Sequence, residues 1–216
     1  MYAQTRKIKP TRRSVSGIFA FRSSESIPFE STLERDFLIR TEFNLSVSKI
    51  IAQPTQIPFI GSNGRSYIYT PDFLVYGDGQ KTLLVEVKPK EELDIKWSLL
   101  KPKFKYAHRY AKERGWLFKI YHENRIRDQK LKNIQFLQRF KRLDVDPALV
   151  NSFRTFLDKS GQLPFIDAIK IFNGEALAKP INDTQVWHLL AARVIECELT
   201  THPIDEKTII WIRQSE

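Results

Sequence analysis

Two strand-like segments joined by a short turn constrain the fold of this chain more than any other feature. Residues 72–76 and 81–88 are rich in β-branched, aromatic and leucine side chains, and residues 77–80, with the sequence GDGQ, form a typical turn cluster between them. Pro89 ends the second segment, because proline cannot donate a ladder hydrogen bond. The pattern predicts an antiparallel β-hairpin with a four-residue turn.

If residues 76 and 81 face each other across this turn, Asp72 lies opposite Val85 and beside Glu86. Side chains alternate between the two faces of a strand, so Glu86 and Lys88 share one face while Val85 and the next valine pack into the core. Two neighbouring carboxylates repel each other and raise each other's pKa unless a cation lies between them. The hairpin therefore predicts a cation-binding pair of acids.

The residue types at this pair indicate a particular chemistry. Carboxylate oxygens are ligands that Mg²⁺ and Mn²⁺ prefer, so Asp72 and Glu86 are candidate metal ligands. Lys88 can orient a water molecule or stabilise the charge that develops at phosphorus. Together they predict a site for metal-assisted phosphodiester hydrolysis. The alternative is a surface hairpin with an ordinary Glu–Lys pair, since an isolated D…ExK pattern also arises by chance.

A helix is predicted upstream of the hairpin. Ser26 can cap it and Pro28 suits its first turn. Glu30 and Glu34 lie four residues apart on one face of this helix, so either can supply a further carboxylate to the metal site. Two short strands, residues 57–60 and 66–69, follow this helix.

The segments after the hairpin complete the predicted fold class. Residues 94–114 predict an amphipathic helix with a bend at Pro102, residues 116–122 a strand, and residues 125–141 a basic helix. This order of elements predicts an α/β fold with a mixed sheet flanked by helices. The buried stripe of the first helix is expected to consist of Trp97, Leu100, Phe104 and Ala107.

The charge is large and unevenly distributed. The chain of 216 residues has 35 Lys and Arg against 25 Asp and Glu, a formal net charge of +10 that is typical of proteins with a polyanionic partner such as DNA. Residues 1–142 have 28 basic and 14 acidic residues, whereas residues 143–216 have 7 and 11. The shift predicts a domain boundary after residue 142, with DNA binding in the first part and protein binding in the second.

Three regions follow from this division. Residues 1–24 contain six basic residues and no acidic one and are expected to form a basic arm. Residues 25–142 are expected to form the nuclease domain. Residues 143–216 predict three helices followed by two strands, the element order of a winged-helix domain, which is an analogy of fold alone. The predicted helices are residues 147–158, 162–172 and 183–196, and the strands surround residues 197–200 and 208–212.

Several classes of protein are excluded by composition. The single cysteine, Cys197, excludes an internal disulfide framework, and the four histidines lack zinc-site spacing. The chain has no glycine-rich phosphate loop and no run of about 18 apolar residues that could cross a membrane. The basic N-terminus is not followed by an apolar signal core, so a cytoplasmic protein, located at the nucleoid when it acts on DNA, is expected.

Three strings in this order carry a resemblance to a known family. They are FESTLERDF at residues 29–37, YTPDF at residues 69–73 and LVEVKP at residues 84–89. Together they resemble the TnsA endonucleases, the nuclease subunits of heteromeric Tns-type transposases. The resemblance implies a restriction-endonuclease-like core with the PD-(D/E)xK motif. It selects Glu34 over Glu30, so that the metal ligands are Glu34, Asp72 and Glu86, and the catalytic lysine is Lys88.

The resemblance also implies a role and partners. The chain would cut the 5′ ends of a transposon in double-stranded DNA, with Mg²⁺ or Mn²⁺ as cofactor, while a TnsB-type subunit cuts and joins the 3′ ends. The C-terminal domain would contact a TnsC-type AAA+ ATPase. The alternatives are a stand-alone restriction-like nuclease and a catalytically silent DNA-binding adaptor. The presence of Asp72, Glu86 and Lys88 argues against the adaptor.

Overall fold

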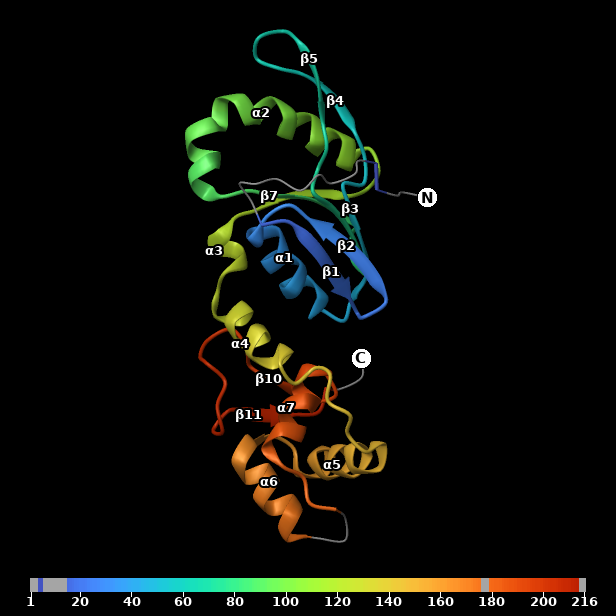
Figure 1. Ribbon diagram of the computed structural model, residues 1–216, viewed down its shortest axis with the longest axis vertical. Coiled ribbons are helices and arrows are strands. Elements are labelled where there is room, and N and C mark those ends of the chain that lie inside the picture. Colours follow the sequence, from blue (N-terminus) through green and yellow to red (C-terminus); the bar gives the residue numbers. More distant parts are fainter. Residues whose placement is uncertain (1–3, 6–14, 176–178, 214–216) are drawn as a thin grey trace. The chain divides into compact units, whose positions relative to one another are not determined.

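The computed structural model describes residues 4–5, 15–175 and 179–213 and divides the chain into two compact units (Figure 1). Unit 1 is Met1–Arg127 and unit 2 is Asp128–Glu216. Most of the predicted basic arm, residues 1–3 and 6–14, lies outside the described residues. None of the described helices is long and apolar enough to cross a membrane.

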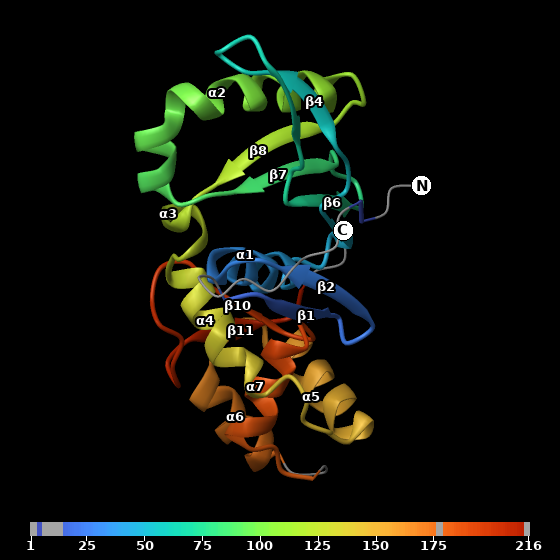
Figure 2. The same cartoon turned by 45° about the horizontal axis from the view of Figure 1, so that its top comes forward.

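A four-stranded mixed sheet forms the centre of unit 1. Its strand order is β3-β6-β7-β8, with antiparallel pairing of β6 to both of its neighbours and parallel pairing of β7 with β8. Helices α1 and α2 cover opposite faces of this sheet (Figures 1 and 2). The predicted α/β class, a mixed sheet flanked by helices, is confirmed. The strands are β3 (Val47–Ala52), β6 (Phe73–Gly77), β7 (Leu83–Val87) and β8 (Leu117–Tyr121).

The central hairpin forms, but its register differs by one residue from the predicted one. Phe73, and not Asp72, is the partner of Val85. The reason is that Gly77 stays in β6 as the partner of Val47 on β3, a strand that the pattern did not predict, so the turn begins one residue later. The ladder ends at Phe73, and the Asp72 N–H bonds to the carbonyl oxygen of the same Val85. Asp72 is therefore positioned beside β7 by its bonds to Val85 and Val87 and not by ladder pairing.

The N-terminal segment differs more strongly from its prediction. Residues Gly17–Phe21 (β1) and Glu25–Phe29 (β2) form an antiparallel hairpin in which Pro28 pairs with Ile18. The predicted helix start at Pro28 and the predicted arm end at residue 24 are therefore wrong. Helix α1 spans Thr32–Glu42 and is capped by Ser31, whose side chain accepts the Glu34 N–H. The alternation of polar and apolar residues in β2 outweighs the helix-start signal of the proline.

Helix α2 (Lys90–Lys112) begins earlier than predicted and bends elsewhere. The non-helical backbone is at Lys96, six residues before the predicted bend at Pro102. The buried stripe is confirmed at Phe104 and Ala107, but Trp97 is 47% exposed because it follows this kink. The packed half of the helix contacts β4, β7 and β8.

The remaining elements of unit 1 agree with the sequence pattern. Strands β4 (Ile57–Ile60) and β5 (Ser66–Tyr69) pair into a hairpin with the predicted bounds. The predicted basic helix after β8 is instead divided into α3 (Glu123–Ile126), which lies in unit 1, and α4 (Gln129–Gln138), which lies in unit 2.

Unit 2 contains four helices and a small antiparallel sheet among its described residues. The sheet order β10-β11-β9 includes one strand, Leu163–Pro164, that the sequence did not predict. The three predicted helices and two predicted strands are present with shifted ends. The elements after α4 are α5 (Pro147–Ser160), β9 (Leu163–Pro164), α6 (Phe165–Gly174), α7 (Asp183–Ala191), β10 (Glu196–Cys197) and β11 (Ile209–Trp211).

The boundary between the units lies at residue 127, earlier than the predicted boundary at residue 142, because α4 packs into unit 2. The ring of Phe136 on α4 meets Trp187 on α7 edge-to-face, with centroids 5.1 Å apart. The buried Asn133 side chain donates to the carbonyl oxygens of Leu199 and His202, at 2.9 and 2.7 Å. A charge count detects neither contact.

Moving the boundary changes the charge of each unit. Residues 1–127 contain 23 Lys and Arg against 13 Asp and Glu, and residues 128–216 contain twelve of each. The whole net charge of +10 therefore resides in unit 1. Unit 2 is neutral rather than acidic, so its predicted role as a protein-binding module has no support from net charge.

Asn133→Ala is expected to destabilise unit 2 by roughly 2–4 kcal/mol, because the carbonyl groups of Leu199 and His202 both lose their hydrogen bond from the buried Asn133 amide. Hydrogen exchange of the full chain would show this as faster exchange in residues 199–204. The exposed neighbour Gln135→Ala serves as the control and should leave exchange unchanged. Equal protection in both variants would show that this side chain does not hold the segment.

Candidate active site

Asp72 lies just before β6, at the end of the hairpin where β7 finishes. Its backbone N–H donates to the Val85 carbonyl oxygen at 3.0 Å, which continues the ladder of the hairpin. Its Oδ2 accepts the backbone N–H of Val87 at 2.7 Å. The carboxylate is thus fixed against the strand that carries Glu86.

The environment of Asp72 disfavours its charged form. Burial raises the pKa of Asp72 well above its usual range, and the carboxylates of Glu86 and Glu34 raise it further. The Val87 N–H and the Lys88 ammonium act in the opposite direction without compensating. Three acidic side chains therefore influence one another at this position, as the sequence predicted for two of them.

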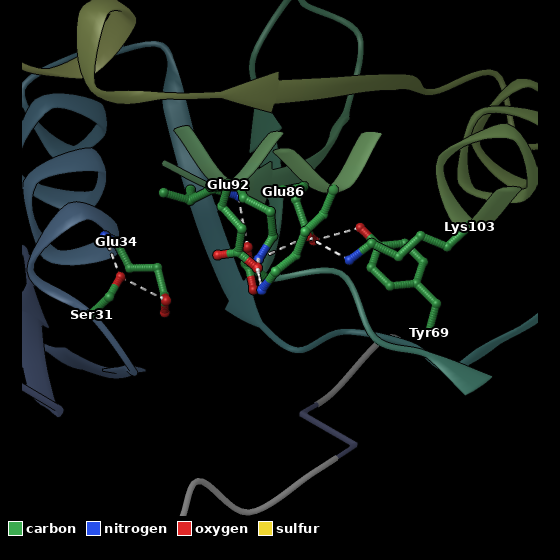
Figure 3. Close-up of polar contacts among 10 residues, drawn as sticks. Ser31, Glu34, Tyr69, Glu86, Glu92 and Lys103 are labelled. Carbon is green, nitrogen blue, oxygen red and sulfur yellow. Dashed lines mark hydrogen bonds and ion pairs between the residues drawn. The ribbon is translucent and has the colours of Figure 1, made fainter. Parts of the chain in front are cut away.

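Glu86 is buried on β7, with only 3% of its surface exposed. Its Oε2 accepts the hydroxyl proton of Tyr69 at 2.6 Å, and its Oε1 accepts the Lys103 ammonium at 2.8 Å. Figure 3 shows Tyr69 and Lys103 reaching Glu86 from the same side, with Lys103 extending from α2. Each carboxylate oxygen of Glu86 therefore has a donor.

The Tyr69 hydroxyl acts as a donor in this arrangement. Burial raises the pKa of Tyr69 well above its usual range, and the nearby Glu86 and Asp72 carboxylates add to the effect. The phenol therefore keeps its proton and donates a hydrogen bond to Glu86.

Sequence reasoning did not identify Tyr69 and Lys103 as site residues, although the pattern contained one signal. Lys103 lies three residues after Leu100 and four before Ala107, two positions of the predicted buried stripe. A lysine at that spacing lies on the packed side of a helix. Such a lysine needs a carboxylate partner, because an unpaired buried charge is costly.

Lys88 follows Glu86 by two residues, and its ammonium lies 4.0 Å from Glu86 Oε1 and 3.5 Å from Glu92 Oε1. Its backbone N–H donates to the Tyr121 carbonyl oxygen, which extends the pairing of β7 with β8. Partial burial raises the pKa of Glu92, but Lys88 and Lys96 together outweigh it and lower that pKa overall. Glu92 is thus an ionised partner of Lys88 that the sequence did not reveal.

Glu34 occupies the first turn of α1 and serves there as a capping residue. Its carboxylate accepts hydrogen bonds from the Ser31 hydroxyl at 2.9 Å and the Glu30 backbone N–H at 2.8 Å, while its own backbone N–H donates to the Ser31 hydroxyl oxygen. Burial raises the pKa of Glu34, with Glu30 and Glu86 adding to the rise. The negative charge of Glu86 therefore raises the pKa of Glu34, although the Glu34 carboxylate is bonded to Ser31 at the start of its own helix (Figure 3).

The predicted residues are brought together to different degrees. Asp72, Glu86 and Lys88 lie at the end of the hairpin. Glu34 interacts electrostatically with Asp72 and Glu86, and its own hydrogen bonds are to Ser31 and Glu30. Among the described residues, no three His, Cys, Asp or Glu side chains are arranged to hold a metal ion as they stand. Two neighbouring acids, one with a strongly raised pKa, nevertheless have the donor chemistry that suits a hard divalent cation.

The comparison with known families agrees with this site. Residues 44–123 match the family model described as TnsA-like endonuclease N terminal. This part of the chain is thus similar to a TnsA-like endonuclease domain, which confirms the resemblance seen in the sequence. Asp72, Glu86, Lys88 and Lys103 fall within the match, and Glu34 precedes it. A search of curated proteins finds no match to this chain.

The thiol of the single cysteine, Cys197, lies in an environment that favours its protonated form. Burial raises the pKa of Cys197 to about 12, so the thiol stays protonated at neutral pH. Arg193 acts in the opposite direction but does not compensate.

Asp72→Asn is expected to stabilise the metal-free protein at pH 7. An acid whose folded pKa is raised contributes stability that is present below its unfolded pKa and is lost as pH rises through the folded pKa. Ionised Asp72 therefore costs stability at neutral pH, whereas the neutral amide keeps an acceptor for the Val87 N–H. We expect the melting temperature measured in a chelator to rise by roughly 2–4 °C at pH 7.

The control for this prediction is the pH dependence of the rise in melting temperature. At pH 4 the wild-type carboxyl is largely protonated, so the gain should shrink. The exposed turn variant Asp78→Asn should show no such gain at either pH. A melting temperature of Asp72→Asn equal to or below that of the wild type at pH 7 would contradict the raised pKa.

Proposed function

We propose that this protein is a Mg²⁺- or Mn²⁺-dependent DNA endonuclease of the TnsA type. The observation that supports it most is that Asp72 is bonded to the strand that carries Glu86 and Lys88, within residues similar to a TnsA-like endonuclease domain. Two acids and a lysine at the end of a hairpin form the PD-(D/E)xK arrangement of restriction-endonuclease-like nucleases, whose core we propose for unit 1.

Asp72 and Glu86 would hold the divalent cation, with Glu34 contributing a third carboxylate. The cation supplies a more acidic water and neutralises charge at the scissile phosphate. Burial and, after it, repulsion by Glu86 and Glu34 raise the pKa of Asp72, and a bound cation would relieve this repulsion. Lys88 would donate a hydrogen bond to the attacking water or to a phosphate oxygen, where negative charge grows during the reaction.

Unit 1 would bind the DNA. It has the entire net charge of +10, and cationic side chains bind duplex phosphates by releasing counterions. We propose that the substrate is the end of a Tns-type transposon, cut at its 5′ strand, and that a TnsB-type subunit processes the 3′ strand. Unit 2, for which we propose a winged-helix-like fold, would contact a TnsC-type AAA+ ATPase.

The division of labour between the units can be tested with the fragments 1–127 and 128–216. The first is expected to bind DNA with an affinity that falls steeply as salt increases, and the neutral second fragment is expected to bind DNA weakly. The second should capture the ATPase in a pulldown. Capture of the ATPase by the first fragment alone would overturn this assignment.

Cleavage by the purified chain distinguishes the proposal from a stand-alone nuclease. A transposase subunit should cut a transposon-end duplex in Mg²⁺ only when the TnsB-type and TnsC-type partners are present. Robust cutting without them would favour the stand-alone nuclease.

A further inference from the structure

Lys103 is the one lysine of α2 that we find bonded to a buried carboxylate among the described residues. Its ammonium is 2.8 Å from Glu86 Oε1, and only 17% of its side chain is exposed. The other lysines in the same half of the helix, Lys101, Lys105 and Lys112, are exposed. A lysine ammonium is ordinarily solvated, so the burial of Lys103 depends on its ion pair with Glu86.

Aromatic rings fix the position of this ammonium. It lies 4.5 Å from the centroid of the Tyr69 ring and 4.9 Å from that of Phe104. The same Tyr69 donates its hydroxyl to the other oxygen of Glu86. A cation over aromatic faces is stabilised where water is excluded, so these rings hold the ammonium next to Glu86.

The two donors differ in charge, and this difference matters for a metal ligand. Tyr69 orients Glu86 through a neutral hydrogen bond, whereas Lys103 places a positive charge at Oε1. A divalent cation at Glu86 must displace this ammonium or bind against its repulsion. Lys88, at 4.0 Å, is more distant from the same oxygen.

We propose that Lys103 is a positioning residue of the nuclease centre, which holds Glu86 through Oε1 and limits the affinity of that carboxylate for a divalent cation. This inference rests on the proposed function. It assigns different roles to the two lysines of the centre: Lys88 acts on the reacting phosphate, and Lys103 acts on the ligand. The metal dependence of the enzyme is then set by α2 as well as by the hairpin.

Calorimetric titration of the full chain with Mn²⁺, without DNA, tests this role by a measurement that does not depend on cleavage. Lys103→Met keeps the aliphatic stem and removes the charge, so it should bind the cation about ten-fold more tightly than the wild type. Lys103→Arg keeps the charge and should bind as the wild type does. Tyr69→Phe removes a neutral donor and should change the affinity much less than Lys103→Met.

Lys105→Met is the matched control, because Lys105 is on the same helix but exposed, and it should bind like the wild type. If Lys103→Met does not fold, Lys103→Gln makes the same test, since it retains a donor for Oε1 without the charge. Unchanged or weaker binding by the uncharged variant would overturn the role of Lys103. Absence of binding by the wild type and every variant would instead contradict the proposed metal dependence itself.

Discussion

Asp72→Ala is expected to reduce DNA cleavage by on the order of 10³-fold or more while leaving DNA affinity nearly unchanged. Asp72 is one of the two acids that meet at the end of the hairpin, and its loss leaves Glu86 without an adjacent carboxylate. Glu86 is already bonded to Tyr69 and Lys103, so it cannot replace the missing ligand alone. Metal affinity should therefore fall together with cleavage.

DNA affinity is the internal control of this experiment, because phosphate contacts depend on the cationic surface of unit 1 rather than on one acid. Asp78→Ala, in the exposed turn of the same hairpin, is the matched variant and should cleave normally. Calorimetry with Mn²⁺ and a DNA-binding titration measure the two properties separately. Normal metal binding by Asp72→Ala would remove this residue from the site.

Lys88→Ala is expected to lower the cleavage rate by about 10²-fold, the effect typical of losing one preorganised donor to a developing charge. An ammonium cannot be a metal ligand, so its effect should be on the rate and not on metal affinity. Affinity should stay level or rise, because a positive charge 4.0 Å from Glu86 Oε1 disappears. The remaining Glu92 then loses one of its two cationic partners.

The products of the complete reaction offer a second measurement for Lys88→Ala. If the partner subunit still joins the 3′ ends, insertions should shift towards cointegrates that retain the donor DNA. Lys90→Ala is the matched control, because Lys90 is two residues further along and pairs with the exposed Asp94. A large loss of metal affinity, or unchanged 5′ cleavage, would show that Lys88 has a different role.

The hairpin and its acids could be predicted because local signals determine them. Alternating valines, a glycine-containing turn and Pro89 specify two paired strands, and Asp72 and Glu86 follow from their position. The register could not be predicted, since it depends on Gly77 pairing with Val47 in a third strand. Tertiary pairing thus decided which residue is the ladder partner of Val85.

Contacts distant in sequence explain what else the sequence did not reveal. Tyr69 and Lys103 reach Glu86 from β5 and α2, each 17 residues away in sequence. The boundary at residue 127 depends on Asn133 bonding to residues 199 and 202. Periodicity shows which side of a helix is packed but does not identify the partner of that side.

Strand-specific mapping of cuts on an end-labelled transposon duplex tests the central claim most directly. The reaction would contain the full chain, its TnsB-type and TnsC-type partners and Mg²⁺, with the wild type compared against Asp72→Ala. We predict a 5′-strand cut by the wild type that is lost in the variant or in a chelator, while 3′ cleavage persists in the variant. A 5′ cut of normal rate by Asp72→Ala would contradict the assignment of this hairpin as the nuclease centre.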